Sequence, residues 1–170
     1  MITYLKGDAT KPAYNQAETR ILPHIVNTAG GWGSGYVLAL SKRWKDPELE
    51  YRNWFKHYTL TTGKSQLPLG AIQIVPVSDE FGYLYVINMV AQEAYMTNSN
   101  PVPLRYSALV TCLNELKKWL NEQQEVDKTS TYSINMPRIG SGLSGGDWKK
   151  IEEIINVCLK DENIFVYDLE

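Results

Sequence analysis

The chain of 170 residues has little of what builds a metal site or a disulfide framework. It contains two histidines and two cysteines, and the cysteines, Cys112 and Cys158, do not form a Cys-x-x-Cys pair. A zinc site is therefore not expected. Both cysteines lie among apolar residues of helical patterns and are interpreted as small buried side chains in a reducing compartment. We predict no metal and no cofactor.

Long apolar runs and an excess of positive charge are also absent. No run approaches the ~20 apolar residues of a membrane-spanning helix, and the N-terminus, MITYLKGDAT, has no basic start followed by an apolar stretch. The net charge is −2, so no global positive field would hold a nucleic-acid backbone. We expect a cytoplasmic protein with no membrane partner and no strong nucleic-acid partner, in which any anionic ligand is held locally.

The composition is that of one globular unit. Hydrophobic residues make up 44% of the chain and charged residues 21%, unlike the composition of a disordered chain. A length of 170 residues is enough to bury a core without disulfides or a metal. No repeat, low-complexity tract or linker interrupts the sequence. We predict a single domain over residues 1–170 and expect a monomer.

Hydrophobic periodicity alternates between strands and helices along the chain. Strands are predicted at residues 2–7, 20–29, 70–77, 84–91, 131–137 and 163–169. Helices are predicted at residues 36–44, 47–58, 105–123 and 147–160. The third and fourth strands flank the turn SDEFG and are predicted to form a hairpin. The interleaving predicts a three-layer α/β/α sandwich with a mixed central sheet, whose ligands bind beyond the carboxyl ends of strands.

Two glycine-rich stretches each follow a predicted strand and precede a predicted helix. The first reads GGWGSG at 30–35 and the second GSGLSGG at 140–146. Ordering so many glycines is entropically costly, so we expect the backbone there to approach a ligand closely. The first N–H groups of a helix lack intrahelical partners and carry partial positive charge, which suits a phosphate. The two loops together predict a diphosphate held from two sides; glycines that only permit tight turns are the alternative.

Two nucleotide-binding motifs compete with this interpretation. The stretch from Gly140 to Gly145 spells G-x-G-x-x-G, and Asp168 ends the next predicted strand, as in a dinucleotide fingerprint. Only two residues follow Asp168, so the second half of a dehydrogenase is not expected. Neither glycine loop contains the lysine of a Walker motif. We therefore expect neither a nicotinamide dehydrogenase nor a nucleoside triphosphatase.

Several motifs of the chain together resemble a macrodomain. They are, in chain order, KGDAT, HIVNTAGGWGSGYVLALSKRW, INMVAQ and MPRIGSGLSGGDW, so the likeness extends over nearly the whole chain. Within that superfamily, MPRIGSGL is similar to the branch of the ADP-ribose 1″-phosphate phosphatase and the terminal ADP-ribose protein glycohydrolase, the Appr-1″-p processing proteins. The resemblance implies a cleft for ADP-ribose or an ADP-ribose derivative, and ADP-ribosylated protein as a further partner.

The resemblance assigns one end of this cleft to adenine. Asp8 would accept a hydrogen bond from the adenine amino group, and Ala9 would help to define the slot. The alternative for Asp8 is a capping carboxylate before Thr10. Tyr167 is similar to an aromatic residue that flanks adenine in several macrodomains, and it is otherwise a core residue.

The resemblance places the two glycine loops along the phosphates and the distal ribose. The residues implied for the ribose and its phosphate are Asn27, Gly31, Trp32, Gly33, Ser34 and Gln92. Further main-chain donors would come from Ser141, Gly142, Leu143, Ser144, Gly145 and Gly146. Trp32 would shield the cleft from water or anchor its loop, and Arg138 is assigned a structural role in support of the second loop.

Three residues are candidates for catalysis. A histidine at the position of His24 has a catalytic role in the phosphatase branch, and a neutral imidazole suits a general acid or base. The alternative is a hydrogen-bonded core histidine. Asp147 would be an acidic partner or a carboxylate that stabilises the start of a helix. Asn88 would assist phosphoester hydrolysis together with His24 and the loops.

The glycohydrolase of this branch is known for a lysine on the INM strand and an aspartate directly after GxGL. The present strand reads Ile87-Asn88-Met89-Val90, and Ser144 stands in the position of the aspartate, so both groups are missing. We therefore predict a phosphatase-type hydrolase of ADP-ribose 1″-phosphate or a related ADP-ribose ester. The alternatives are a non-catalytic reader of ADP-ribose or ADP-ribosylated protein, and a de-ADP-ribosylating hydrolase with altered catalytic residues.

Overall fold

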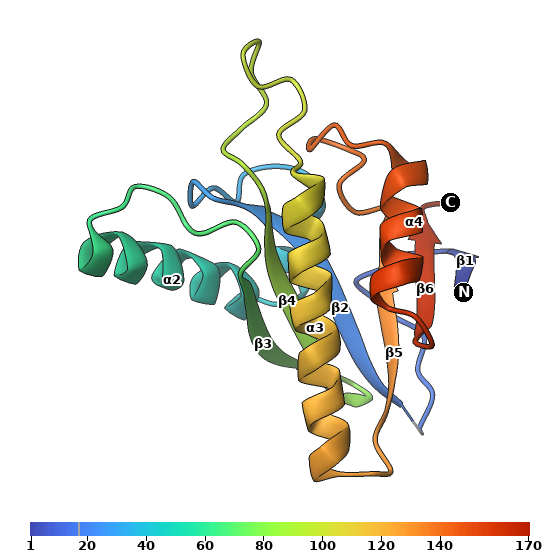
Figure 1. The fold of residues 1–170 in the computed structure, drawn as a ribbon. Helices are drawn as coiled ribbons and strands as arrows, with labels where there is room; N and C mark the ends of the chain where they lie inside the picture. Colours follow the sequence, from blue (N-terminus) through green and yellow to red (C-terminus); the bar gives the residue numbers. More distant parts are fainter. Residues whose placement is uncertain (17) are drawn as a thin grey trace.

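The computed structural model of the protein describes residues 1–16 and 18–170 (Figure 1). The strands are β1 (Ile2–Lys6), β2 (Glu18–Asn27), β3 (Ile72–Asp79), β4 (Gly82–Gln92), β5 (Thr131–Met136) and β6 (Asn163–Asp168). The helices are α1 (Tyr36–Arg43), α2 (Asp46–Thr62), α3 (Tyr106–Val126) and α4 (Trp148–Cys158). Every strand and helix expected from the periodicity is present, with ends that lie within four residues of the pattern.

The strands form one mixed sheet in the order β1-β6-β5-β2-β4-β3. β3 runs antiparallel to β4, with Asp79 paired to Gly82 across a tight turn, whereas the other neighbouring strands are parallel. A short turn can join adjacent strands only when they are antiparallel, because parallel neighbours need a longer crossover connection. The predicted hairpin and the mixed central sheet are therefore confirmed.

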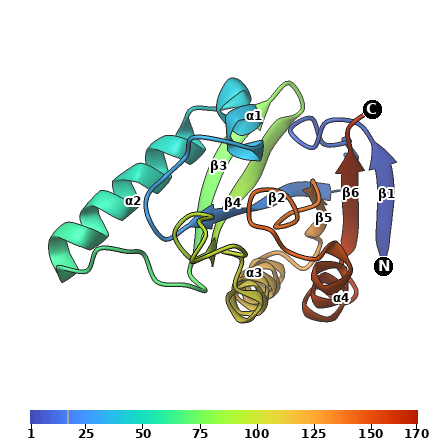
Figure 2. The same cartoon turned by 90° about the horizontal axis from the view of Figure 1, so that it is seen from above.

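Helices cover both faces of the sheet. α1 and α2 lie on one face, and α3 and α4 lie on the other (Figure 2). Two apolar cores result, one that includes Leu40, Tyr51 and Val86, and one that includes Leu113 and Ile155. This arrangement is the three-layer α/β/α sandwich that the sequence predicted. In the described part of the chain, no helix has both the length and the apolar composition needed to cross a bilayer.

Helical spacing explains how α3 packs, and less completely how α2 packs. The fully buried leucines of α3 lie at helical spacing and are Leu109, Leu113, Leu116 and Leu120. In α2, Tyr51 is fully buried, but Leu49 is 53% exposed. Residues two apart lie on nearly opposite sides of a helix. Leu49 therefore lies outside the buried side of α2.

Parallel pairing brings the carboxyl ends of β2, β4 and β5 to one edge of the sheet. The register places His24 of β2 beside Asn88 of β4. The loops that follow these strands, residues 28–35, 93–105 and 137–147, emerge together at the upper edge of the sheet in Figure 1. Open α/β sheets bind ligands at this edge.

An ion pair is buried near the start of β2. The Arg20 guanidinium donates two hydrogen bonds of 2.7 Å to the Asp79 carboxylate, and the two side chains are only 2% and 4% exposed. The stacked rings of Tyr14 and Phe81 lie over the guanidinium, with centroids 5.5 and 5.6 Å from its carbon. The hydrogen bonds from Arg20 lower the pKa of the Asp79 carboxyl. Either partner alone would be an uncompensated buried charge.

We expect Asp79→Ala to lower the free energy of unfolding by about 3–5 kcal/mol, because the Arg20 guanidinium would stay buried without its counter-ion. Since folding lowers the pKa of Asp79, this stabilisation is complete above the ordinary carboxyl pKa of 3.8 and is lost as the pH falls below it. Urea unfolding at pH 7 and at pH 3 measures both effects.

The matched control for this prediction is Glu125→Ala. Glu125 pairs with Lys128, and the side chains of this pair are 78% and 74% exposed. An exposed pair contributes little, so the control should cost less than about 1 kcal/mol. Equal losses in Asp79→Ala and Glu125→Ala would contradict the importance given to the buried pair.

Candidate functional site

The two glycine loops line one cleft of about 490 Å³. The first loop contributes Gly31, Trp32, Gly33, Ser34 and Gly35. The second loop contributes Gly140, Gly142, Leu143 and Ser144. Residues 24–27 of β2 lie in the same lining. The loops therefore converge on a shared cleft, as their placement after two strands of one sheet predicted.

Asn27 holds the first loop in shape. Its Oδ1 accepts hydrogen bonds from the N–H groups of Ala29 (2.9 Å) and Gly31 (3.1 Å), and its Nδ2 donates to the Gly31 carbonyl (3.0 Å). The Tyr51 hydroxyl accepts from the Gly30 N–H (3.1 Å) and donates to the Asn27 carbonyl (2.5 Å). Asn27 lines the cleft, but its polar side-chain atoms are engaged by the loop itself.

The tip of the first loop leaves its main-chain donors free. Within the described residues, the N–H groups of Gly33 and Ser34 meet no acceptor of the chain. α1 begins directly afterwards at Tyr36, so its positive end adds to the field of these donors. A Cβ at Gly31 would lie 2.3 Å from the Tyr95 hydroxyl, so glycine at this position leaves room for the Tyr95 side chain. This part of the cleft therefore suits an anion.

The second loop divides its amides between its own structure and the cleft. The N–H of Gly145 donates to the Gly142 carbonyl (3.0 Å), and the N–H of Gly146 donates to the Gly140 carbonyl (2.7 Å). These amides shape the loop, and neither glycine lines the cleft. Of the second-loop donors predicted from the sequence, Gly142, Leu143 and Ser144 are the ones that line it.

Ser141 is also turned toward the loop. Its N–H and its hydroxyl both donate to the Arg138 carbonyl, at 3.4 and 2.8 Å. Arg138 forms a two-bond ion pair with Asp168, with distances of 2.7 and 3.0 Å. The pair fits the structural role predicted for Arg138, because its charge is already matched at the end of β6.

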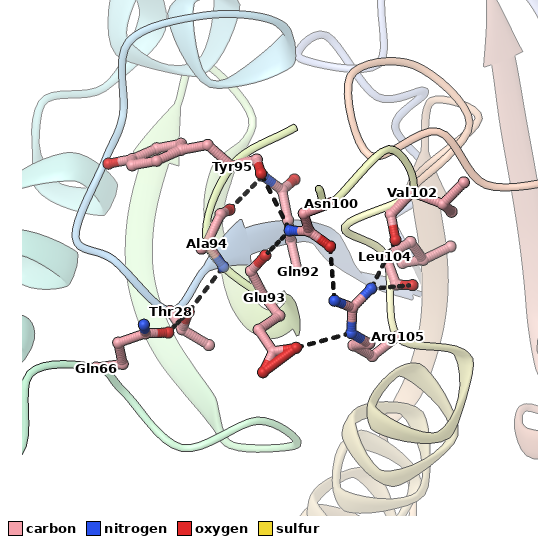
Figure 3. Close-up of polar contacts among 10 residues, drawn as sticks. All are labelled: Thr28, Gln66, Gln92, Glu93, Ala94, Tyr95, Asn100, Val102, Leu104 and Arg105. Atoms are coloured by element: carbon pink, nitrogen blue, oxygen red, sulfur yellow. Dashed lines mark hydrogen bonds and ion pairs between the residues drawn. The ribbon is translucent and has the colours of Figure 1, made fainter. Parts of the chain in front are cut away.

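Gln92 connects the second glycine loop to the loop that follows β4. Its Oε1 accepts from the Ser144 hydroxyl (2.5 Å), and its Nε2 donates to the Ala94 carbonyl (2.9 Å). The Ala94 N–H donates in turn to the Thr28 hydroxyl (2.9 Å), as Figure 3 shows. Gln92 therefore lines the cleft, and its amide fixes one wall to another. Its assignment to the ribose stays a prediction.

Arg105 ties the 93–105 loop into a fixed shape (Figure 3). It donates to the Glu93 carboxylate (2.9 Å) and to Asn100 Oδ1 (2.7 Å). The Nδ2 of Asn100 donates to the carbonyls of Glu93 (2.8 Å) and Tyr95 (3.0 Å). The loop thereby holds Tyr95 and its neighbour Met96 in the cleft lining. Sequence reasoning missed both, because an irregular loop carries no periodic signal.

His24 lies on the floor of the cleft, enclosed by aromatic rings. It is 1% exposed, and the rings of Trp32 and Tyr36 lie 5.4 and 5.9 Å from its own. Its Nε2 lies 2.5 Å from Asn88 Oδ1, whereas its Nδ1 has no partner among the described residues. Burial lowers the pKa of His24 from 6.5 to about 4, so the imidazole is neutral near pH 7.

Tyr36 also lines the cleft, although the sequence pattern indicated only that a helix begins there. It lines the cleft, and within the described chain its buried hydroxyl has no hydrogen-bond partner. Burial raises the pKa of Tyr36, and the nearby Asp8 carboxylate raises it further. A buried unpaired hydroxyl is costly, which distinguishes it from the satisfied core hydroxyls of Tyr51 and Tyr167.

The residues expected at the adenine end lie outside the lining of the cleft. Asp8 Oδ1 accepts hydrogen bonds from the N–H (2.8 Å) and the hydroxyl (2.7 Å) of Thr10, and Ala9 is buried. Tyr167 is also buried, and its hydroxyl donates to Asn135 Oδ1 (2.8 Å). These contacts are those of the structural alternatives, a capping carboxylate and a core tyrosine. Their assignment to adenine stays a prediction.

Trp32 and two catalytic candidates also have structural contacts. The Trp32 Nε1 donates to the Ser41 hydroxyl (2.7 Å), so this cleft residue anchors its loop to α1. Asp147 is exposed, and its side chain accepts from the Lys149 N–H (3.0 Å) as the N-cap of α4. Asn88 is fully buried behind His24. Neither Asp147 nor Asn88 lines the cleft.

Solved structures share this architecture over the whole chain. A Bacteroides thetaiotaomicron protein of unknown function is 41% identical, with a TM-score of 0.81, and the match covers 99% of this chain and 98% of that one. A macrodomain protein from Streptomyces coelicolor is 34% identical, with a TM-score of 0.74 and 99% of both chains covered. The likeness therefore holds in sequence as well as in fold.

Two named proteins are also similar to this chain in sequence. An ADP-ribose 1″-phosphate phosphatase of Saccharomyces cerevisiae is 27% identical over 188 residues, covering 99% of this chain and 98% of that protein. The chain is 30% identical to a Danio rerio chromodomain-helicase-DNA-binding protein 1-like over 169 residues, but it spans only 15% of that protein's length. No family model matches the chain.

The buried His24 predicts a loss of stability in mild acid. Its pKa is about 4 in the folded protein against 6.5 ordinarily, so the unfolded chain binds a proton that the folded protein excludes. The free energy of unfolding should be unaffected above pH 6.5 and fall toward pH 4 by up to about 3 kcal/mol. Urea unfolding of the wild type and His24→Gln between pH 7.5 and 4.5 measures this, and His24→Gln should show the flatter decrease.

His57→Gln is the control for this prediction, because His57 is exposed on α2. The free energy of unfolding of His57→Gln should fall with decreasing pH as steeply as that of the wild type. Wild-type and His24→Gln stabilities that fall in parallel over this range would show that His24 does not exclude the proton.

Proposed function

This chain belongs to the macrodomain family, and from that membership we propose that it binds ADP-ribose in the cleft between its glycine loops and hydrolyses ADP-ribose 1″-phosphate or a related ADP-ribose ester. The observation that carries the proposal is the convergence of two strand-to-helix loops with free main-chain donors on one cleft. The whole-length relative named as an ADP-ribose 1″-phosphate phosphatase supports the choice of substrate.

Main-chain amides would hold the diphosphate. The donors are the N–H groups of Gly33 and Ser34 on one side and of Gly142 and Leu143 on the other, with the start of α1 adding its dipole. A cationic side chain is not needed for this, and Arg138 at the cleft wall is already paired with Asp168. Local binding of this kind is compatible with a net charge of −2.

The ligand would lie with adenine toward Asp8, Ala9 and Tyr167, and with its distal ribose toward His24 and Gln92. Support for this direction comes from Tyr36, which lines the cleft, lies against the His24 ring and is affected electrostatically by Asp8 and Tyr167. Tyr36 therefore lies between the two ends that the assignment requires.

The proposed reaction uses water as the nucleophile. An O–P bond forms between water and the 1″-phosphate as the bond from phosphorus to the ribose oxygen breaks, which gives ADP-ribose and inorganic phosphate. Neutral His24 would accept the proton of the attacking water and return it to the leaving oxygen. The loop amides would stabilise the charge on the remaining phosphate oxygens.

Binding without turnover is the second candidate function. It is favoured by the burial of His24, which is 1% exposed, and by the position of Asp147 outside the cleft lining. A de-ADP-ribosylating hydrolase with altered residues has less support, because Ser144, in the position of the family's aspartate, is bonded to Gln92. The two leading candidates differ in one measurable quantity, phosphate release.

Gly33→Val tests whether the cleft binds ADP-ribose. Gly33 lines the cleft, its backbone does not have a positive φ, and a Cβ there would have no neighbour within 4 Å. The variant should fold normally but weaken ADP-ribose binding by at least about tenfold, or ~1.4 kcal/mol, because the side chain fills space beside the amide donors. Isothermal calorimetry measures affinity, and thermal unfolding checks the fold.

Ser65→Val is the matched control, because Ser65 is exposed and does not line the cleft. It should bind ADP-ribose as the wild type does. If the folded wild-type protein gives no heat and no thermal shift with ADP-ribose, the proposed function is wrong.

Phosphate release distinguishes a hydrolase from a reader that binds without turnover. The wild type should release phosphate from ADP-ribose 1″-phosphate, and His24→Gln should lower this rate about 100-fold.

A further inference from the structure

Three polar side chains form a row across the floor of the sheet. His24 of β2 is the register partner of Asn88 of β4, and Asn88 is the register partner of Gln73 of β3. Side chains in register on neighbouring strands point to the same face. The row continues into α2, where the carbonyls of Pro47 and Glu50 accept hydrogen bonds from it. The sheet register thus connects the cleft histidine to a helix on the same face.

The carbonyls of α2 fix the direction of both amides in this row. Gln73 Nε2 donates to the Glu50 carbonyl (2.9 Å), so Gln73 presents its oxygen to Asn88. Asn88 Nδ2 donates to that oxygen (3.0 Å) and to the Pro47 carbonyl (3.1 Å). Main-chain carbonyls accept only, so a reversed amide would place oxygen against oxygen. Asn88 therefore has only its Oδ1 left for His24.

The fixed Asn88 oxygen decides which nitrogen of His24 carries the proton. Oδ1 lies 2.5 Å from Nε2 and can only accept, so Nε2 must be the N–H of the neutral ring. The other tautomer would hold two lone pairs together between two buried side chains. Nδ1 is then an acceptor, and it is the ring nitrogen without a partner in the described chain.

We propose that Gln73 is a positioning residue, which acts through Asn88 to fix His24 as the Nε2-protonated tautomer and so presents Nδ1 as a hydrogen-bond acceptor. Resting on the proposed function, this defines what His24 meets in the cleft. An acceptor nitrogen pairs with a hydroxyl or a water molecule and repels a phosphate oxygen. The phosphates therefore belong to the loop amides, and the attacking water or a ribose hydroxyl belongs to His24.

The structure separates this role of Gln73 from ligand contact. Gln73 and Asn88 do not line the cleft, whereas His24 does. Substitution of Gln73 should therefore change the state of the histidine without removing a surface that touches the ligand. In hydrolases that use a histidine base, the tautomer is set by the partner of the second ring nitrogen, and the wrong tautomer lowers kcat.

The first test is a two-bond 1H–15N correlation spectrum of ligand-free protein labelled with 15N-histidine, in a His57→Gln background that leaves His24 alone. At pH 7.5 we expect a protonated, pyrrole-type Nε2 and a pyridine-type Nδ1. Gln73→Leu should shift the spectrum toward a mixture of tautomers, because it removes one of the two acceptors that hold the Asn88 amide and leaves only the Pro47 carbonyl. Gln124→Leu is the matched control, since Gln124 bonds to Ser130 in another part of the fold, and it should leave the spectrum unchanged.

The second test is kinetic. Gln73→Leu should lower kcat for phosphate release about tenfold or more with little change in KM. Gln73→Glu should restore only part of the loss, because one carboxylate oxygen still accepts from Asn88 Nδ2 while the other faces the Glu50 carbonyl, to which the Gln73 amide donated. Thermal unfolding of each variant excludes a loss of fold as the cause.

The outcomes separate this inference from the proposed function. A protonated Nδ1 in the wild type, or a Gln73→Leu spectrum identical to that of the wild type, would overturn the role of Gln73. If the tautomer is as expected but ADP-ribose does not bind, the proposed function is wrong and the assignment of the histidine stands, because it is read from ligand-free protein.

Discussion

The parallel pairing of β2 with β4 and β5 is the constraint on which the rest of the structure depends. Parallel neighbours end at the same edge of a sheet, so the loops that leave these strands must share that edge. Both glycine loops and the 93–105 loop therefore meet around one cleft, although they are far apart in the sequence. An antiparallel arrangement of the same strands would place the two glycine loops at opposite edges. The strand pairing thus determines where the cleft lies, independently of the side chains that line it.

Near that cleft, two arginines are matched by carboxylates, and the proposed donors to the ligand belong to the backbone. Arg138 pairs with Asp168 and Arg105 pairs with Glu93, and each pair fastens segments of the fold together. The amides of Gly33 and Ser34 have no acceptor within the described part of the chain, and glycine lets the loop turn such amides outward without a Cβ. An anion can therefore be bound by a protein of slightly negative net charge, since the attraction comes from local dipoles. Asn27 and Gln92 fix the shape of the loops, and a fixed shape keeps these dipoles pointing in one direction.

Buried polar groups on the cleft floor follow the rule that burial requires a partner, and the exceptions mark the site. Asn88 and Gln73 satisfy their amides on each other and on α2. Within the described residues, the exceptions are His24 Nδ1 and the Tyr36 hydroxyl, and both side chains line the cleft. A row of satisfied groups that ends in an unsatisfied acceptor is the arrangement expected where a ligand or water completes the network.

The sequence by itself determined the strands, the helices, their layering and the two glycine loops, because hydrophobic spacing and glycine placement are local signals. It also carried the family motifs, and with them His24 and most residues of the loop tips. Only the tertiary structure decided which amides are free, since Gly145 and Gly146 donate within their own loop. It also decided that Asp147 and Asp8 cap local turns, that Tyr36 and Tyr95 line the cleft, and that Gln73 bonds to Asn88. The physical reason is that hydrogen bonds between residues far apart along the chain depend on register and packing, and no local pattern encodes them.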